Sequence, residues 1–190
     1  MNSKPKKYVI MFVGHTHTGK TTFAKKLAKN FPDTVRIDND EIALFAKEKY
    51  PSAVLSPYNK IKRGFSNPNL KFLLFKDIYK FCLRAAMNVI LSNGNLAKDG
   101  RTLVARNAKK HGYVLVTVYF NLPHEIILKR LKETKKDNKV FITSKNWFEL
   151  FENQKGYAQL PPSKKSGLYF EIKNEKDYLA IMKQLVNLLK

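Results

Sequence analysis

Acidic residues are scarce in this sequence: 15 Asp and Glu stand against 36 Lys and Arg, which leaves a formal net charge of +21. A surface of this kind attracts polyanions, with nucleic acid as the first choice and an acidic membrane surface as the second. An alternative is that the many lysines reflect AT-rich coding, although codon usage explains the shortage of acidic residues less easily. The charge favours a nucleic-acid partner.

Cysteine is almost absent, and long apolar runs are missing. Cys82 is the single cysteine, which excludes an internal disulfide and favours a reducing, cytoplasmic setting. No run of about 18 apolar residues occurs, so no transmembrane helix is expected. The apolar run after the basic N-terminus is short, which argues against a cleaved signal peptide. We therefore expect no contact with a membrane.

Short apolar runs alternate with amphipathic stretches, and no internal repeat is visible. The strands are expected at Tyr8–Val13, Thr34–Ile37, Asn88–Ser92, Tyr113–Phe120 and Leu168–Ile172. The helices are expected at Thr21–Asn30, Asp40–Lys49, Asn69–Met87, Gly100–His111, Pro123–Glu133, Ser144–Asn153 and Glu175–Leu189. This alternation predicts a single α/β domain over residues 1–190, with a parallel five-stranded sheet between two layers of helices. Trp147, Phe148 and Phe151 have helical spacing and are expected in the core.

Two segments are irregular, residues 50–69 and 132–139. Ligands of open α/β sheets bind beyond the carboxyl ends of the strands, so the first is interpreted as a substrate-binding insertion and the second as a lid. Plain solvated loops are the alternative for both. The first segment offers cations for the phosphates of a single strand, and its aromatic residues either stack on bases or anchor the loop. These residues are Lys60, Lys62 and Arg63 with Tyr58 and Phe65.

The segment from Gly14 to Thr21, GHTHTGKT, matches the phosphate-loop pattern G-x-x-x-x-G-K-[ST] between a buried strand and a helix. Its two glycines let phosphate oxygens approach the backbone N–H groups, and the following helix N-terminus adds to this anion site. Lys20 is expected on the β- and γ-phosphates, and the Thr21 hydroxyl on Mg²⁺. The expected nucleotide contacts are Gly14, His15, Thr16, His17, Thr18, Gly19, Lys20, Thr21 and Thr22.

The two histidines of this loop occupy its variable positions. A zinc site would need further ligands, and the chain offers no cysteine pair beside them. We expect the side chains of His15 and His17 to point outward or toward the base and to tune phosphate or substrate contact.

The second expected strand ends in the segment RIDNDEIALF, which brings two carboxylates to its carboxyl end. A carboxylate at this place accepts the proton of an attacking hydroxyl or orients Mg²⁺-bound water. Alternation along a strand puts Asp38 and Asp40 on one face with Asn39 opposite. Capping of the next helix by either aspartate is the alternative, and it is compatible with catalysis. Asp40 is predicted to be the catalytic carboxylate, and Asp38 to contact substrate.

Four segments together resemble the P-loop kinase group that contains the phage-type 5′-hydroxyl polynucleotide kinases and, more distantly, zeta-toxin-like and small-molecule kinases. They are GHTHTGKTTFAKKLAKN, IDNDEI, ILSNGNLAKDGRTLVARNAKKHGYVLVTVYFNLPHEIILKRL and FENQKGYAQLPPSKKSGLYFEIKNEKDYLAIMKQL. The resemblance implies a three-layer P-loop fold with a lid, and transfer of the γ-phosphoryl of ATP, with Mg²⁺, to the 5′-hydroxyl of DNA or RNA. It is consistent with a phage or repair setting.

The resemblance also assigns roles. Asp40 matches the general base, Lys20 and Thr21 the phosphate-loop residues, and Arg130 the arginine of the lid helix. Arg101 matches an arginine after an Asn-Leu turn and is expected on the acceptor or a phosphate. Two departures stand out. Asn93 replaces an aspartate that would help to hold Mg²⁺, and the lid has lysines (Lys132, Lys135 and Lys136) where a second arginine is usual.

Two other functions stay open. The acceptor is a small molecule in one of them, and a zeta-toxin-like kinase falls in this class. In the other, the chain binds nucleic acid and ATP without kinase activity, for which Asn93 and the arginine-poor lid are the best support. The sequence does not specify the donor base or the oligomeric state.

Overall fold

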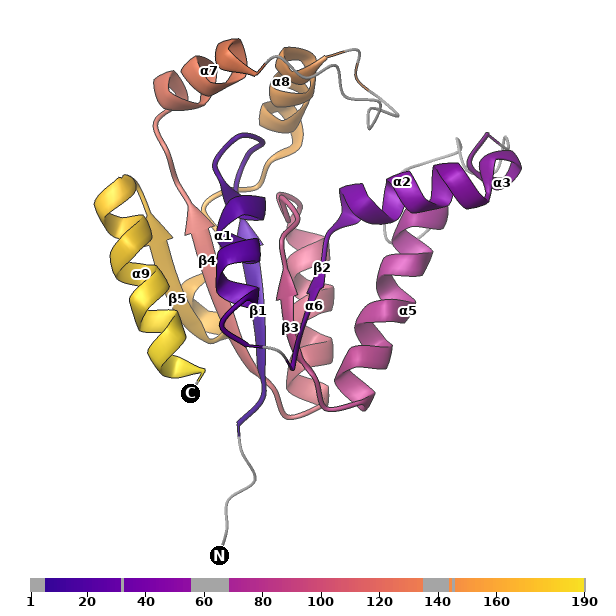
Figure 1. The fold of residues 1–190 in the computed structure, drawn as a ribbon, viewed down its shortest axis with the longest axis vertical. Helices are drawn as coiled ribbons and strands as arrows, with labels where there is room; N and C mark the ends of the chain where they lie inside the picture. Colours follow the sequence, from indigo (N-terminus) through magenta and orange to yellow (C-terminus); the bar gives the residue numbers. More distant parts are fainter. Residues whose placement is uncertain (1–5, 32, 56–68, 135–143, 145, 190) are drawn as a thin grey trace, which may run out of the picture.

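The computed structural model describes residues 6–31, 33–55, 69–134, 144 and 146–189. Its sheet has five parallel strands in the order β2-β3-β1-β4-β5 (Figure 1). The strands are β1 (Tyr8–Val13), β2 (Thr34–Ile37), β3 (Asn88–Leu91), β4 (Val114–Phe120) and β5 (Leu168–Ile172). The fold is the predicted three-layer α/β fold of P-loop NTPases and kinases.

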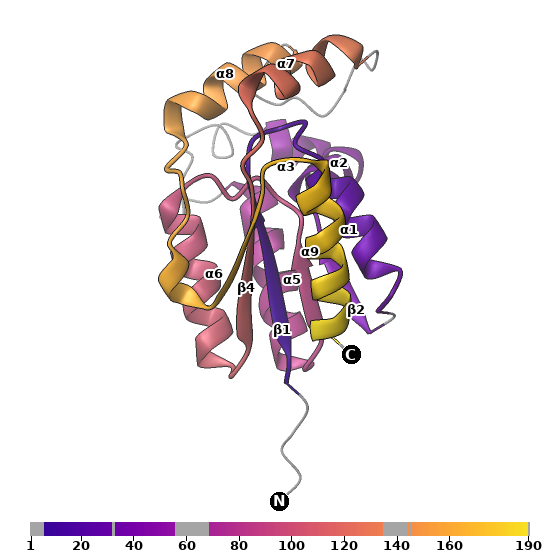
Figure 2. The same ribbon diagram turned by 90° about the vertical axis from the view of Figure 1, so that its left-hand side faces the viewer.

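The helices are arranged in two layers and a cap. They are α1 (Lys20–Ala28), α2 (Asn39–Lys49), α3 (Pro51–Leu55), α5 (Leu70–Arg84), α6 (Lys98–Lys110), α7 (His124–Glu133), α8 (Trp147–Tyr157) and α9 (Glu175–Leu188), with a short 3₁₀ helix, η1 (Lys164–Ser166). Helices α1 and α9 cover one face of the sheet, α5 and α6 cover the other, and α7 and α8 lie above the carboxyl ends of the strands (Figures 1 and 2). In the part of the chain described, no helix has the length and apolarity needed to span a bilayer.

The side chains of β1 belong alternately to two hydrophobic cores, because successive side chains of a strand point to opposite faces of the sheet. Ile10 and Phe12 pack with residues of α1 and α9, whereas Val9, Met11 and Val13 pack with residues of α5 and α6. All six residues of this strand are buried. The loop that follows β1 therefore leaves from the middle of a sheet fixed on both sides.

The predicted strands agree with the structure to within one residue at each end. The helix bounds differ by up to four residues: α1 ends at Ala28 instead of Asn30, α5 at Arg84 instead of Met87 and α8 at Tyr157 instead of Asn153, and α6 begins at Lys98 instead of Gly100. Two further differences have a local cause. Helix α8 begins at Trp147 instead of Ser144, because the Asn146 side chain accepts a hydrogen bond from Glu149 N (2.9 Å) and caps the helix there. Pro51–Leu55 forms the short helix α3 in a region expected to be irregular. Proline is favoured in a first helical turn, where its missing N–H costs no hydrogen bond.

Candidate active site

The phosphate loop joins β1 to α1 at the carboxyl end of the sheet. Gly14 has φ 150°, and a Cβ at this position would lie 2.8 Å from the backbone oxygen of Phe120, so only glycine fits. Gly14 N also donates to Gly94 O (3.0 Å), which ties the loop to the segment after β3. Gly19, in the left-handed region with φ 91°, then starts α1. The loop thus has the geometry that its sequence predicts.

Lys20 is folded back onto this loop. Its Nζ donates to His15 O and to Thr18 Oγ1 (3.1 Å), and the side chain is 8% exposed. Burial lowers the pKa of Lys20 to about 8, and the charges of Asp40 and Asp38 oppose this shift. Thr21 and Thr22 follow in the first turn of α1 and are exposed.

Asp38 lies next to Thr21. The Thr21 hydroxyl donates to Asp38 Oδ2 (3.4 Å), and Ser92 Oγ donates to the same oxygen (2.9 Å). These three side chains carry oxygen atoms, the ligands that Mg²⁺ prefers. The residues present therefore fit a magnesium ion held by Thr21 and Asp38. Among the described residues there is no cluster of three or more His, Cys, Asp or Glu that could hold a metal ion.

Asn93, which stands where the resembling kinases have an aspartate, is used differently. Its Oδ1 accepts from Asn39 N (2.7 Å), so this oxygen holds the start of α2. At this edge of the sheet Asp38, which follows β2, accepts from Ser92, the residue directly after β3 (2.9 Å).

The prediction that Asp38 and Asp40 share a strand face is wrong. Strand β2 ends at Ile37, and Asp38 Oδ1 accepts from Asp40 N (2.9 Å), which caps helix α2 and puts Asp40 in its first turn. Partial removal from water raises the pKa of Asp40, and the charge of Asp38 raises it further. Lys71 and Lys20 act in the opposite direction. Asp40 is thus a carboxylate of raised basicity beside the phosphate loop.

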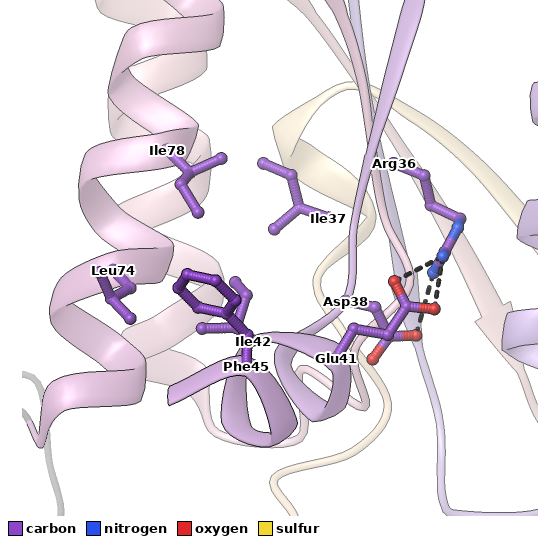
Figure 3. Close-up of a pocket in the computed structure, with 8 residues that line it drawn as sticks. All are labelled: Arg36, Ile37, Asp38, Glu41, Ile42, Phe45, Leu74 and Ile78. Atoms are coloured by element: carbon purple, nitrogen blue, oxygen red, sulfur yellow. Dashed lines mark hydrogen bonds and ion pairs between the residues drawn. The ribbon is translucent and has the colours of Figure 1, made fainter. Parts of the chain in front are cut away.

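Arg36 forms hydrogen bonds with two acidic residues at the start of α2. Its guanidinium donates to Asp38 Oδ2 (3.3 Å) and to both carboxylate oxygens of Glu41 (2.5 and 2.6 Å). Figure 3 shows these contacts beside a hollow of about 350 Å³ between α2 and α5. Its other walls are apolar, with Ile37, Ile42, Phe45, Leu74 and Ile78. Arg36 was not singled out in the sequence, since a lone arginine in a strand carries no signal.

Arg130, from α7, reaches the phosphate loop. Its Nη1 donates to His17 O (3.2 Å), and the same nitrogen lies 3.7 Å from the ideal Cβ position of Gly19. A cation is thus placed over the loop. Of the predicted lid, residues 132 and 133 belong to the last turn of α7 and are helical rather than irregular, and Lys132 is exposed there. Residues 135–139, with Lys135 and Lys136, lie outside the described residues, as do Lys60, Lys62 and Arg63 with Tyr58 and Phe65.

Arg101 has a different position from the one expected. It is 9% exposed, and its guanidinium donates to three backbone oxygens, those of Asn95, Leu96 and Gln159 (2.6–2.9 Å). These bonds join α6 to the segment after α8, so Arg101 supports the loops rather than facing the phosphate site. It lines a cleft of about 490 Å³ with Pro161, Pro162 and Leu115, beside the first half of β4.

The two loop histidines do not point away from the protein. The His15 ring lies 5.4 Å from that of Phe151 and 6.0 Å from that of His124, and the His17 ring lies 4.7 Å from that of Trp147. Burial lowers the pKa of His15 to about 4 and also lowers the pKa of His17. Both histidines therefore pack as neutral rings against α7 and α8.

Sequence reasoning missed the role of α8. It was expected to supply core residues, and Phe151 is indeed buried, whereas Phe148 is 41% exposed. The helix also contributes Gln154, whose Oε1 accepts from Thr16 N (2.7 Å), and this contact spans 138 positions of the chain. A single glutamine in an amphipathic helix gives no signal of such a contact.

The comparisons agree with this architecture. A family model described as an AAA domain matches residues 9–155. No curated protein matches the chain. A proposed kinase from Chloroflexus aurantiacus is similar in structure, with a TM-score of 0.68 and 15% identity over 98% of this chain and 100% of that chain.

Two further structures share the fold. Kti12 from Chaetomium thermophilum, in complex with ADP-AlF3, has a TM-score of 0.63 and 14% identity, with 96% of this chain and 99% of that chain covered. A gluconokinase from Sinorhizobium meliloti has a TM-score of 0.57 and 14% identity over 97% and 95%. At such identities the likeness shows the fold alone. With most of its length matched and the phosphate loop intact, the chain belongs to the AAA-domain family, in the P-loop fold of its kinase-like structural neighbours.

Proposed function

We propose that this protein transfers the γ-phosphoryl group of ATP to the 5′-hydroxyl end of single-stranded DNA or RNA. The observation that carries the proposal is Asp40, a carboxylate of raised pKa beside the phosphate loop and within the electrostatic influence of Lys20. A general base must be a stronger base than an ordinary carboxylate to accept a hydroxyl proton efficiently. Asp40 is exposed at the surface, but the protein around it displaces part of its water, and the neighbouring negative charge of Asp38 raises its pKa further.

In the proposed reaction the 5′-hydroxyl oxygen attacks the γ-phosphorus, and a new P–O bond forms. The bond between the γ-phosphorus and the β–γ bridging oxygen breaks, which releases ADP. The hydroxyl proton passes to the Asp40 carboxylate, and the product is a 5′-phosphorylated end. Because the transition state of phosphoryl transfer involves little covalent help from the protein, positioning and charge stabilisation provide most of the catalysis.

Lys20, Arg130, Thr21 and Asp38 provide the positioning and the charge stabilisation in this proposal. Lys20 binds the β- and γ-phosphates in place of its present contacts with the loop, and Arg130 stabilises charge from the lid side. Thr21 and Asp38 would hold Mg²⁺, which when bound would neutralise charge on the phosphates. A nucleic-acid acceptor is supported by the net charge of +21, which a neutral acceptor does not need.

The test is transfer of labelled γ-phosphate from ATP to 5′-hydroxyl DNA and RNA oligonucleotides. Lys20→Ala and Asp40→Asn serve as matched inactive controls, and oligonucleotides with a 5′-phosphate serve as blocked acceptors. We expect label on the 5′-hydroxyl ends with the wild type only. Label at or below the level of both variants contradicts the proposal.

A small-molecule acceptor is the second candidate. Its support is the gluconokinase among the structural neighbours, although that likeness extends to the fold alone. The same assay with gluconate and with nucleosides in place of the oligonucleotide separates the two. Label on these small acceptors, with none on oligonucleotides, would favour this second reaction.

A further inference from the structure

One face of α8 runs along the phosphate loop. Trp147 contacts His17 at a ring distance of 4.7 Å, Phe151 contacts His15 at 5.4 Å, and Gln154 Oε1 accepts from Thr16 N at 2.7 Å. Residues four and then three apart lie on one side of a helix, so these side chains form a single stripe. Three successive loop residues are thus each in contact with a residue of this stripe.

Tyr157 is the next position of that stripe, three residues after Gln154. Its ring is 53% exposed. Burial of the hydroxyl raises the pKa of Tyr157, and the negative charge of Asp40 raises it further. The stripe that contacts the phosphate loop therefore ends in an aromatic ring with an accessible surface.

Gln154 and Lys20 hold one peptide unit from two sides. Lys20 Nζ donates to His15 O, and Gln154 Oε1 accepts from Thr16 N, which belongs to the same peptide bond. The carbonyl oxygen and N–H hydrogen of a trans peptide point in opposite directions. Lys20, which reaches the terminal phosphates of a nucleotide, and the side chain of Gln154 thus flank the same part of the loop.

We propose that this stripe of α8 is the acceptor-side wall of the active site, where Tyr157 stacks on the terminal nucleoside of the incoming strand and Gln154 positions its 5′-hydroxyl. This inference rests on the proposed function. An exposed aromatic ring binds any base through its π face, so it suits an acceptor chosen by its end rather than its sequence. The contact of Gln154 with Thr16 uses Oε1, so it leaves the Nε2 donors of the side chain for the acceptor.

The first test measures steady-state kinetics with a 5′-hydroxyl oligonucleotide. Tyr157→Ala is expected to raise the acceptor KM about tenfold, since loss of one stacked base costs about 1–3 kcal/mol. Tyr157→Phe keeps the ring and should stay within about twofold of the wild type. Phe148→Ala removes another exposed ring from the same helix and is the matched control. An acceptor KM unchanged in Tyr157→Ala, or raised equally in Phe148→Ala, overturns the stacking role.

The kinetics of a Gln154 variant test the positioning role separately. Gln154→Met removes both the contact with Thr16 and the Nε2 donors, and should lower kcat about tenfold while the KM for ATP stays within about twofold. A purely structural role predicts the opposite pattern, in which the affinity for ATP is lost with the shape of the loop. That outcome would overturn the positioning role.

Direct binding separates this inference from the reaction itself. Fluorescence anisotropy of a labelled 5′-hydroxyl oligonucleotide is measured with the ADP-bound wild type, Tyr157→Ala and Tyr157→Phe, none of which needs to turn over. Weakening of about tenfold in Tyr157→Ala alone supports the stacking surface even if no transfer occurs, in which case only the proposed reaction fails. Equal binding by all three overturns the role of α8 alone. No binding by the wild type overturns both.

Discussion

Asp38 and Asp40 are two positions apart, and the structure gives them different surroundings. Asp38 is 7% exposed and accepts hydrogen bonds from Thr21, Ser92 and Arg36. Asp40 stands in the first turn of α2, and its pKa responds to the charges of Lys71 and Lys20. These surroundings support the proposed division of roles, in which Asp38 holds the metal ion and Asp40 accepts the proton.

The two aspartates should respond differently to substitution. Asp38→Asn removes a charged oxygen from the site next to Thr21, so the Mg²⁺ concentration for half-maximal activity is expected to rise about tenfold. Asp40→Asn should lower kcat by a factor of about 10²–10⁴ at saturating Mg²⁺, because it removes the base. Activity measured across a Mg²⁺ titration checks both. An unchanged Mg²⁺ requirement in Asp38→Asn contradicts the metal role.

The lowered pKa of the buried Lys20 leads to a prediction about stability. Its pKa falls from 10.5 in the unfolded chain to about 8 in the folded protein, so the unfolded chain binds more protons between these pH values. Burying the charged Lys20 therefore lowers the free energy of unfolding. This destabilisation is fully present below about pH 8 and disappears as the pH rises toward 10.5.

Lys20→Met should therefore stabilise the nucleotide-free protein near neutral pH while abolishing nucleotide binding. We expect the free energy of unfolding at pH 7 to rise by about 1–3 kcal/mol, less what the two lost hydrogen bonds contributed. The difference from the wild type should shrink at pH 10. Urea unfolding of both proteins at these two pH values provides the measurement, and a variant less stable than the wild type at pH 7 argues against this account.

At the scale of elements, the periodicity of apolar residues and the turn signals in the sequence were enough to predict the fold. The strands could be predicted because apolar runs such as Tyr8–Val13 are bounded by a charged start and a glycine loop. Helix ends were harder, since they depend on single caps such as Asp38 and Asn146. The contact of Gln154 with Thr16 was beyond sequence reasoning, because it joins two elements that only the complete chain path brings together.

Two helix caps offer a matched pair of substitutions. Asn146 caps α8 by accepting from Glu149 N (2.9 Å), and Asn174 caps α9 by accepting from Lys176 N and Asp177 N. Either change to alanine should lower the free energy of unfolding by about 1 kcal/mol. Only Asn146→Ala is expected to raise the acceptor KM, because α8 contacts the phosphate loop, whereas α9 packs against α1 and β5. Thermal unfolding and kinetics of both variants check this, and equal kinetic effects would speak against a special role of α8.

At the scale of the whole molecule, the residues proposed for chemistry gather at one end of the sheet. The phosphate loop follows β1, Asp38 follows β2, and α7 and α8 lie above them (Figure 2). Parallel strands bring all their carboxyl ends to the same edge, so residues from distant parts of the chain meet there. The fold thus gathers the residues proposed to bind a nucleotide, a metal ion and an acceptor in one place, while both faces of the sheet are filled with apolar side chains.

The net charge of +21 leads to a prediction about the salt dependence of acceptor binding. If the acceptor is a polyanion, its affinity must fall with salt, because each neutralised phosphate releases counterions, with a slope of about −0.7 per contact for a single strand. For about four contacts, raising NaCl from about 50 to about 200 mM should weaken oligonucleotide binding about 50-fold. Uncharged acceptors have no counterions to release, so their KM should change little over the same range. Anisotropy titrations at several salt concentrations measure the slope, and a slope near zero would mean that the basic surface has no part in holding the acceptor.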